Sequence, residues 1–159
     1  MPRQRKWGNF IIENSVADAF SNARSEIEEL HGEMESWRDN LDQCEGLNQT
    51  SKYEEVDEAT NYLETANDTL SNLELERYGE KIKYAEHRKS GYPRWVRLSN
   101  AVAALEAIGG WMETYMESIR ENSKMTDEDQ GYIDEAEELV SDIQEATGEL
   151  ENVSFPGMF

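Results

Sequence analysis

Apolar residues recur at alternating steps of three and four along much of the chain, the spacing that lines up one side of an α-helix. The first such stretch begins at Ser15 and carries its apolar seam as far as Cys44. The second begins at Ser51, and its seam reaches Leu73. Each start has an acidic residue three positions later, as in a capping box. Residues 15–75 are therefore predicted to form a first helical hairpin.

A second pair of helices is predicted over residues 94–153. Its first helix, over about residues 94–121, is the most apolar stretch of the chain. This helix contains Gly109 and Gly110, which predict either a kink or the close approach of another helix to the bare backbone. The second helix begins at Thr126, with Asp129 as its capping-box partner.

The two predicted hairpins resemble each other in sequence. Residues 34–40 (MESWRDN) match residues 116–122 (MESIREN) at five of seven positions. In the second helices, residues 56–59 (VDEA) parallel residues 133–136 (IDEA). The order and register agree in both pairs, which favours an internal duplication. We therefore predict one all-α domain over residues 1–159, an antiparallel four-helix bundle built from two similar hairpins with coiled-coil-like seams.

Three segments lie outside the hairpins. Residues 1–14 are predicted to form a basic N-terminal arm, and residues 76–93 a basic connector. The helical seam continues weakly through Tyr78, Ile82 and Ala85, so this connector either extends the second helix to Lys89 or contains a short helix over about residues 80–89. The tail, residues 154–159, is apolar. Phe155 and Phe159 either fold back over the end of the bundle or anchor the tail in a groove on a partner.

Composition narrows the class of protein. A chain of 159 residues with 37% hydrophobic residues has material for one folded core. The single cysteine, Cys44, suits a reducing compartment, and its place on the seam predicts a small buried side chain. The chain shows no signal-peptide pattern and no apolar run long enough to span a bilayer. The expected location is cytoplasmic, which means the host cytoplasm or the virion if the protein is viral.

The chain offers little catalytic chemistry. One metal-ligand spacing occurs, Glu28 followed by His31, but the other histidine, His87, has no glutamate three residues before it. The tryptophans at helical spacing, Trp37, Trp95 and Trp111, are interpreted as core residues. We therefore expect a protein that is not an enzyme and that holds no metal and no cofactor.

Charge is strongly segregated along the chain. The formal net charge is −20, yet residues 77–97 hold seven basic and two acidic side chains. These seven form the predicted basic interaction segment: Arg77, Lys81, Lys83, Arg88, Lys89, Arg94 and Arg97. By contrast, residues 125–159 contain no Lys or Arg. The last helix presents the predicted acidic interaction face: Asp134, Glu138, Asp142, Glu145 and Glu149.

Three interpretations of this acidic face remain open. It is a solvated face that keeps the protein soluble, a docking surface for a basic partner or for segment 77–97 of another copy, or a mimic of a nucleic-acid backbone. For the basic segment, a protein partner or a self-contact is favoured over nucleic acid because strong negative charge surrounds it.

The function expected from the sequence is interaction or assembly. We predict a non-enzymatic acidic helical protein, of the kind found among viral or mobile-element accessory proteins, that self-associates as a homo-oligomer or docks on a larger complex. The alternative is an acidic inhibitor that mimics nucleic acid and blocks a DNA- or RNA-binding protein. Membrane binding and direct nucleic-acid binding are not expected.

Overall fold

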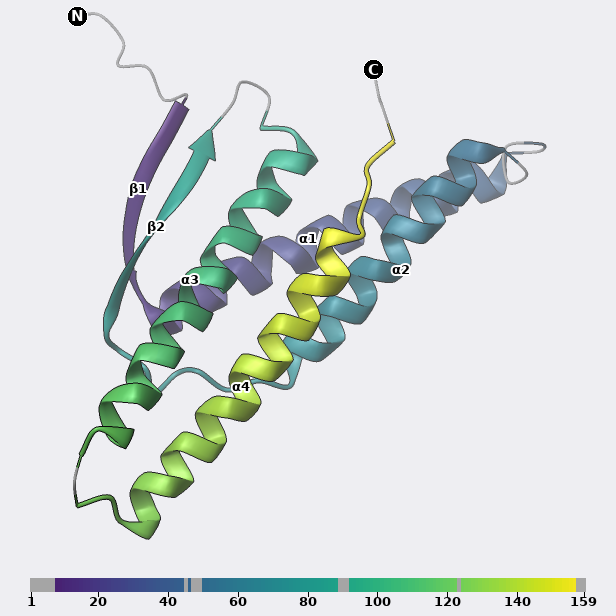
Figure 1. The fold of residues 1–159 in the computed structure, drawn as a ribbon. Helices are drawn as coiled ribbons and strands as arrows, with labels where there is room; N and C mark the ends of the chain where they lie inside the picture. Colours follow the sequence, from purple (N-terminus) through teal and green to yellow (C-terminus); the bar gives the residue numbers. More distant parts are fainter. Residues whose placement is uncertain (1–7, 45, 47–49, 89–91, 123, 157–159) are drawn as a thin grey trace, which may run out of the picture.

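The computed structural model describes residues 8–44, 46, 50–88, 92–122 and 124–156 (Figure 1). These residues form four helices and one two-stranded sheet. In chain order the elements are β1 (Gly8–Ser15), α1 (Val16–Gln43), α2 (Ser51–Ser71), β2 (Lys81–Arg88), α3 (Arg94–Arg120) and α4 (Asp127–Glu151). The protein is mostly helical, as predicted, but the prediction of an all-α fold is wrong.

Helices α1, α2 and α4 begin where short polar side chains cap them, whereas α3 begins after Pro93 without a side-chain cap. The Ser15 hydroxyl accepts a hydrogen bond from the Asp18 amide at 3.0 Å, and this contact opens α1. Thr126 and Asp129 form the complete capping box at the start of α4, which confirms that prediction. For α2 the cap is Thr50 rather than Ser51, which is already the first helical residue.

The four helices enclose one apolar core. Helix α1 packs on α2 and on α3, and α4 packs on α3 and on α2, so α1 and α4 lie diagonally across the core. The seams predicted from the sequence supply most of the buried side chains, among them Ile27, Leu63, Leu105 and Ile143. The ends of two seams differ from the prediction. Cys44 is exposed at the end of α1, and Trp95 is 53% exposed while its neighbour Val96 is buried.

Helix α3 continues unbroken through Gly109 and Gly110. A Cβ atom added at either glycine would meet nothing within 4 Å, so no other helix approaches the bare backbone there. The prediction of close helix packing at this point is wrong, because the neighbouring helices contact other faces of α3.

Strands β1 and β2 form an antiparallel ribbon on one side of α3 (Figure 1). Gly8 lies opposite Arg88 at one end, and Ser15 lies opposite Lys81 at the other. Backbone hydrogen bonds from Val16 and Ala17 continue the pairing beyond β1 into the start of α1. The inward face of the ribbon buries Ile82 and half-buries Tyr84, and the outward face exposes Ile11 and Lys83.

This ribbon corrects two predicted segments. Residues 8–14 of the predicted N-terminal arm lie in β1 and belong to the fold. The connector contains β2 in place of a helix extension or a separate helix over residues 80–89. The side chains of β2 alternate between the two faces, with a period of two. Tyr78, Ile82 and Ala85 match helical spacing by coincidence, and Ala85 is exposed on the strand.

A side chain of α3 caps the far edge of β2 at one position, His87. The Asn100 amide accepts a hydrogen bond from the His87 backbone N–H at 2.8 Å and donates one to the His87 carbonyl at 2.7 Å. It also donates to the Tyr92 hydroxyl at 3.2 Å, and Tyr92 has a positive φ of 41°. Asn100 is 9% exposed. Its side chain satisfies both backbone groups of His87, as a neighbouring strand would.

The two halves of the chain share an order of elements, a strand followed by two helices. The matched methionines Met34 and Met116 are both buried. Both matched arginines reach the second helix of their own half, Arg38 through Asp57 and Arg120 through Glu137. These parallels agree with the sequence repeat.

The Asn100→Ala substitution tests the role of this residue at the edge of β2. Loss of both hydrogen bonds leaves two backbone groups of His87 unpaired, and we expect the free energy of unfolding to fall by about 2 kcal/mol. The His87 amide should also exchange faster with solvent, measured by hydrogen exchange. Ser99→Ala, one position away on an exposed site, is the control and should change neither quantity. Unaltered exchange at His87 in Asn100→Ala would contradict the assigned contact.

Candidate interaction surfaces

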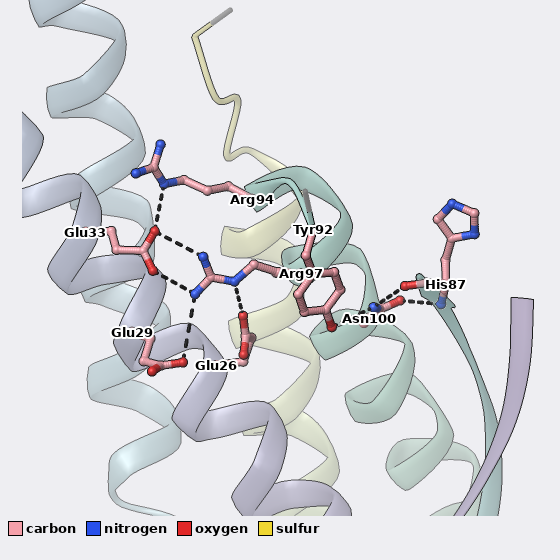
Figure 2. A network of polar contacts seen from close by, with 8 residues as sticks. All are labelled: Glu26, Glu29, Glu33, His87, Tyr92, Arg94, Arg97 and Asn100. Atoms are coloured by element: carbon pink, nitrogen blue, oxygen red, sulfur yellow. Dashed lines mark hydrogen bonds and ion pairs between the residues drawn. The ribbon is translucent and has the colours of Figure 1, made fainter. Parts of the chain in front are cut away.

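The centre of the basic segment is a network of ion pairs between α3 and α1 (Figure 2). Arg97 donates two hydrogen bonds to the Glu33 carboxylate, at 3.0 and 2.7 Å, and a third to Glu26. Glu29 lies 3.8 Å from the same guanidinium, and Arg94 donates to Glu33 at 3.0 Å. Two arginines of α3 thus pair with three glutamates of α1, which leaves one negative charge in the network.

Helical spacing explains why these side chains meet. Glu26, Glu29 and Glu33 lie three and four residues apart and therefore share one face of α1. Arg94 and Arg97 lie three apart in the first turn of α3, which packs on α1. Cations in this position oppose the helix macrodipole, whose positive end is the N-terminus. The carboxylates of α1 compensate for that unfavourable position.

Hydrogen bonding and partial burial shift the pKa values of Arg97 and Glu33. Arg97 is 15% exposed, and its hydrogen bonds with Glu33 raise the pKa of the guanidinium despite partial burial. The hydrogen bonds from Arg97 hold the pKa of Glu33 below its ordinary value of 4.5, although partial burial acts in the opposite direction. Arg94 adds to the lowering of that pKa. Both groups therefore remain charged at neutral pH.

Arg77 also binds side chains of its own chain. Its guanidinium lies over the rings of Tyr78 and Tyr132, at 5.0 and 5.3 Å from their centroids. It forms an ion pair with Glu135 at 3.0 Å. Tyr78 in turn lies edge-on to Trp111, at a ring-centroid distance of 5.6 Å. Arg77 therefore connects the segment before β2 to α4.

The remaining basic residues lie on or near the ribbon. Arg88 pairs with Glu86 at 3.0 Å and lies over the Phe10 ring. Lys81 and Lys83 are exposed and form no ion pair with any residue that the structure describes. Lys89 lies outside the described residues. The predicted basic residues are therefore close in the sequence but do not form one exposed surface. Four arginines bind carboxylates or rings of the same chain, and two lysines point to solvent.

The acidic face of α4 has the opposite character. The Asp134 carboxylate accepts a hydrogen bond from Gln130 at 2.9 Å. Across the described part of the chain, no Lys or Arg pairs with Asp134, Glu138, Asp142, Glu145 or Glu149. Glu138 and Asp142 line a groove with Leu73 and Leu139, between α4 and the segment after α2. The carboxylates predicted as an interaction face are thus available to a partner.

The spacing of these carboxylates bears on nucleic-acid mimicry. Residues four apart on a helix are separated by about 6 Å along its axis. One strand of duplex DNA carries a phosphate about every 3.4 Å. The row from Asp134 to Asp142 is therefore about half as dense in charge as one DNA strand.

The apolar tail folds back at its beginning. Val153 and Phe155 pack against the core, and Pro156 is buried. Val153 and Phe155, together with Leu98 and the exposed Trp95, border a shallow groove between α3 and the end of α4. Phe159, the second predicted anchor, lies outside the described residues.

A small cavity of about 110 Å³ lies between the ribbon, α1 and α3. Alanines of α1 and α3 form one side of it, and Tyr84, Tyr92, Glu26 and Arg97 supply polar groups. Its lining contains no Ser, Cys or His. No group of three or more metal-ligating side chains occurs among the residues that the structure describes. Nor does any helix in that part of the chain have the length and apolar character needed to cross a bilayer.

The features that organise this region were only partly visible in the sequence. The matched spacings of Glu26, Glu29 and Glu33 and of Arg94 and Arg97 were a usable signal, provided that the packing of α3 on α1 was known. Nothing in the sequence marked Asn100. In the comparisons with known proteins, no family model, no curated protein and no solved structure matches this chain.

Arg97→Gln should be the most destabilising single change of charge. It leaves three carboxylates facing each other on α1, and we expect the free energy of unfolding to fall by about 2–3 kcal/mol. Arg120→Gln is the matched control, because the Arg120–Glu137 pair is half exposed on both sides. It should cost less than about 1 kcal/mol. Equal effects of the two substitutions in denaturant titrations would contradict a central role for Arg97.

Glu33→Gln should make stability less dependent on pH. The pKa of Glu33 is lower in the folded protein than in the unfolded chain, so its stabilising effect is complete above about pH 4.5 and is lost as the pH falls through the folded value. At neutral pH we expect the variant to be less stable by about 1 kcal/mol, a modest figure because solvent screens this half-exposed group.

The measurement compares unfolding free energies of the parent and of Glu33→Gln from pH 7 to pH 3. Their difference should shrink toward zero on the acid side. Glu28→Gln, which removes an exposed carboxylate of the same helix that has no ion pair in the described part of the chain, is the control. A constant difference across this range would contradict the assigned ion pair.

Proposed function

We propose that this protein is a non-enzymatic interaction protein whose α4 presents an acidic docking face to a basic protein surface. The observation that carries the proposal is the contrast between the two charged regions. The arginines of segment 77–97 pair with carboxylates of their own chain, whereas the five carboxylates of the acidic face have no cationic partner among the described residues. The scaffold for this face is a bundle of two similar helical hairpins.

The energetic cost of the α4 face supports a role in binding. Like charges four residues apart destabilise a helix by roughly 0.2–0.5 kcal/mol per pair, and Asp134, Glu138 and Asp142 form two such pairs. A basic residue in the same row would have removed this cost. A basic partner removes it on binding, since each carboxylate then gains an opposite charge.

The groove beside the acidic face offers a partner apolar contacts as well as charge. Leu73 and Leu139 are buried at its base, and Glu74, Glu138 and Asp142 border it. An exposed lysine or arginine side chain suits this combination, because its aliphatic part covers apolar surface while its charged end reaches a carboxylate. We therefore favour docking over a purely solvated face.

Ionic self-association through segment 77–97 has less support than docking on a different protein. In the arrangement considered from the sequence, this segment of one copy meets the acidic helices of another. Arg77, Arg94 and Arg97 would first have to leave their own carboxylates. Within this segment, Lys81 and Lys83 are the described cations without such a partner.

The proposal is tested with the pair Glu138→Gln and Asp142→Asn on the full chain. The probe is a 16-residue oligolysine peptide, and its binding is followed by fluorescence anisotropy at low salt, about 50 mM. Each surface charge contributes up to about 1 kcal/mol, so the double variant should bind about three- to tenfold more weakly. The parent should also lose affinity at about 500 mM salt.

The matched control is the pair Glu28→Gln and Asp42→Asn on α1, diagonally across the core from α4. It removes one glutamate and one aspartate and so gives the same net charge. If both double variants bind the probe equally well, the effect is one of total charge and the α4 face is only solvated. Competition of the parent with duplex DNA for a DNA-binding protein, lost in the α4 variant alone, would instead favour the mimicry alternative.

A further inference from the structure

The outer edge of β1 is open. His87, directly opposite Asn9, binds Asn100 through both its backbone N–H and its carbonyl, so this cross-strand pair is not hydrogen-bonded. Hydrogen-bonded and non-hydrogen-bonded pairs alternate along an antiparallel ribbon. The backbone groups of Asn9, Ile11 and Glu13 therefore point away from β2, and they have no partner among the described residues.

In the part of the chain that the structure describes, strand β1 has no proline, edge lysine, bulge or covering element to protect this edge. Natural sheets shield exposed edges with Pro, an edge Lys, a bulge or a covering element. Residues 8–15 contain neither Pro nor Lys, and the register with β2 runs without interruption. Ile11, at the middle of the strand, is 72% exposed. In Figure 1, β1 is the outer strand and β2 lies between it and α3.

We infer that this edge pairs with the β1 edge of a second copy of the chain. A two-fold axis at Ile11 gives the register that uses the whole strand. Ile11 then lies opposite Ile11 of the second copy, Asn9 opposite Glu13, and Phe10 opposite Ile12. No like charges oppose each other, and the apolar residues meet on both faces of the sheet. If the two-fold axis lay at Glu13 instead of Ile11, the Glu13 side chains of the two copies would lie opposite each other.

Charge also selects this surface for contact between copies. Each chain carries a net charge of −20, so most pairs of faces repel. The ribbon is an exception, because β1 and β2 together hold three basic and two acidic residues. Glu13 lies directly opposite Lys83 within its own ribbon. Two ribbons therefore approach each other with little local repulsion.

The assembly closes at two copies. The joined sheet has the order β2-β1-β1-β2, and both of its outer edges are the β2 edges against α3. Asn100 occupies the outward backbone groups of β2 at His87. A closed two-fold dimer is therefore the product, and not an open filament. This dimer uses no residue of the acidic α4 face and is independent of the docking function proposed above.

Sedimentation equilibrium of the full chain tests the dimer. The average mass should rise with concentration from 18.3 kDa toward the mass of two chains. Dimerisation should strengthen between about 50 and 500 mM salt, because salt screens the repulsion between two acidic chains. Association of a basic segment with acidic helices would weaken over the same range. A strict monomer at all concentrations, or a dimer that weakens with salt, would overturn the inference.

Three variants locate the contact. Ile11→Lys places two like charges opposite each other at the two-fold axis and should weaken the dimer about tenfold or more. Ile11→Pro removes an outward N–H without removing a bond to β2 and should have the same effect. Ala85→Lys is the matched control, because Ala85 lies beside Ile11 on the same outward face but on β2. It adds the same charge and should change the dissociation constant less than about twofold.

Hydrogen exchange gives a second readout that does not depend on the variants folding well. The amides of Asn9, Ile11 and Glu13 should exchange rapidly in dilute solution and slow down as the concentration rises. Those of Phe10 and Ile12, which face β2, should be protected throughout. A dimer that persists in Ile11→Lys, or that leaves the Ile11 amide unprotected, would place the contact elsewhere and refute the inference.

Discussion

The contact of Arg97 with Glu26 and Glu33 is the interaction on which the arrangement of this protein depends. Helix α1 has three glutamates on the face turned toward α3, and in isolation they would repel each other. Arg97 and Arg94 turn that repulsion into attraction between the two halves of the chain. The position of α3 in turn sets the position of Asn100, which holds the outer edge of β2.

The same contact changes the meaning of the charge pattern. A cluster of arginines in an acidic protein suggests a binding patch, but here most of them are used inside the fold. Most of the uncompensated charge among the described residues is then negative, and the acidic face of α4 is a large part of it. Interaction with a basic protein follows from that imbalance more naturally than interaction between like copies through opposite charges.

The ribbon provides a different kind of surface, governed by backbone hydrogen bonding. One of its edges lies against α3 and is bonded to it at His87, and no described residue pairs with the other edge, so we expect the ribbon to extend on the β1 side. The two proposed contacts differ in how they should respond to salt. Docking on the α4 carboxylates should weaken as salt rises, whereas pairing through β1 should become easier.

The sequence by itself determined the elements that depend on local rules. The starts of α1, α3 and α4, the capping box at Thr126 and most of the buried seams follow from capping and from helical periodicity. It also marked the α4 carboxylates, because an uncompensated row is visible in one helix alone. Only the tertiary structure decided that residues 81–88 form a strand, since β2 needs β1, about 70 residues away in the chain, to satisfy its backbone. The tertiary structure also decided the role of Arg97, because its partners lie on α1 and the sequence around Arg97 does not identify that helix.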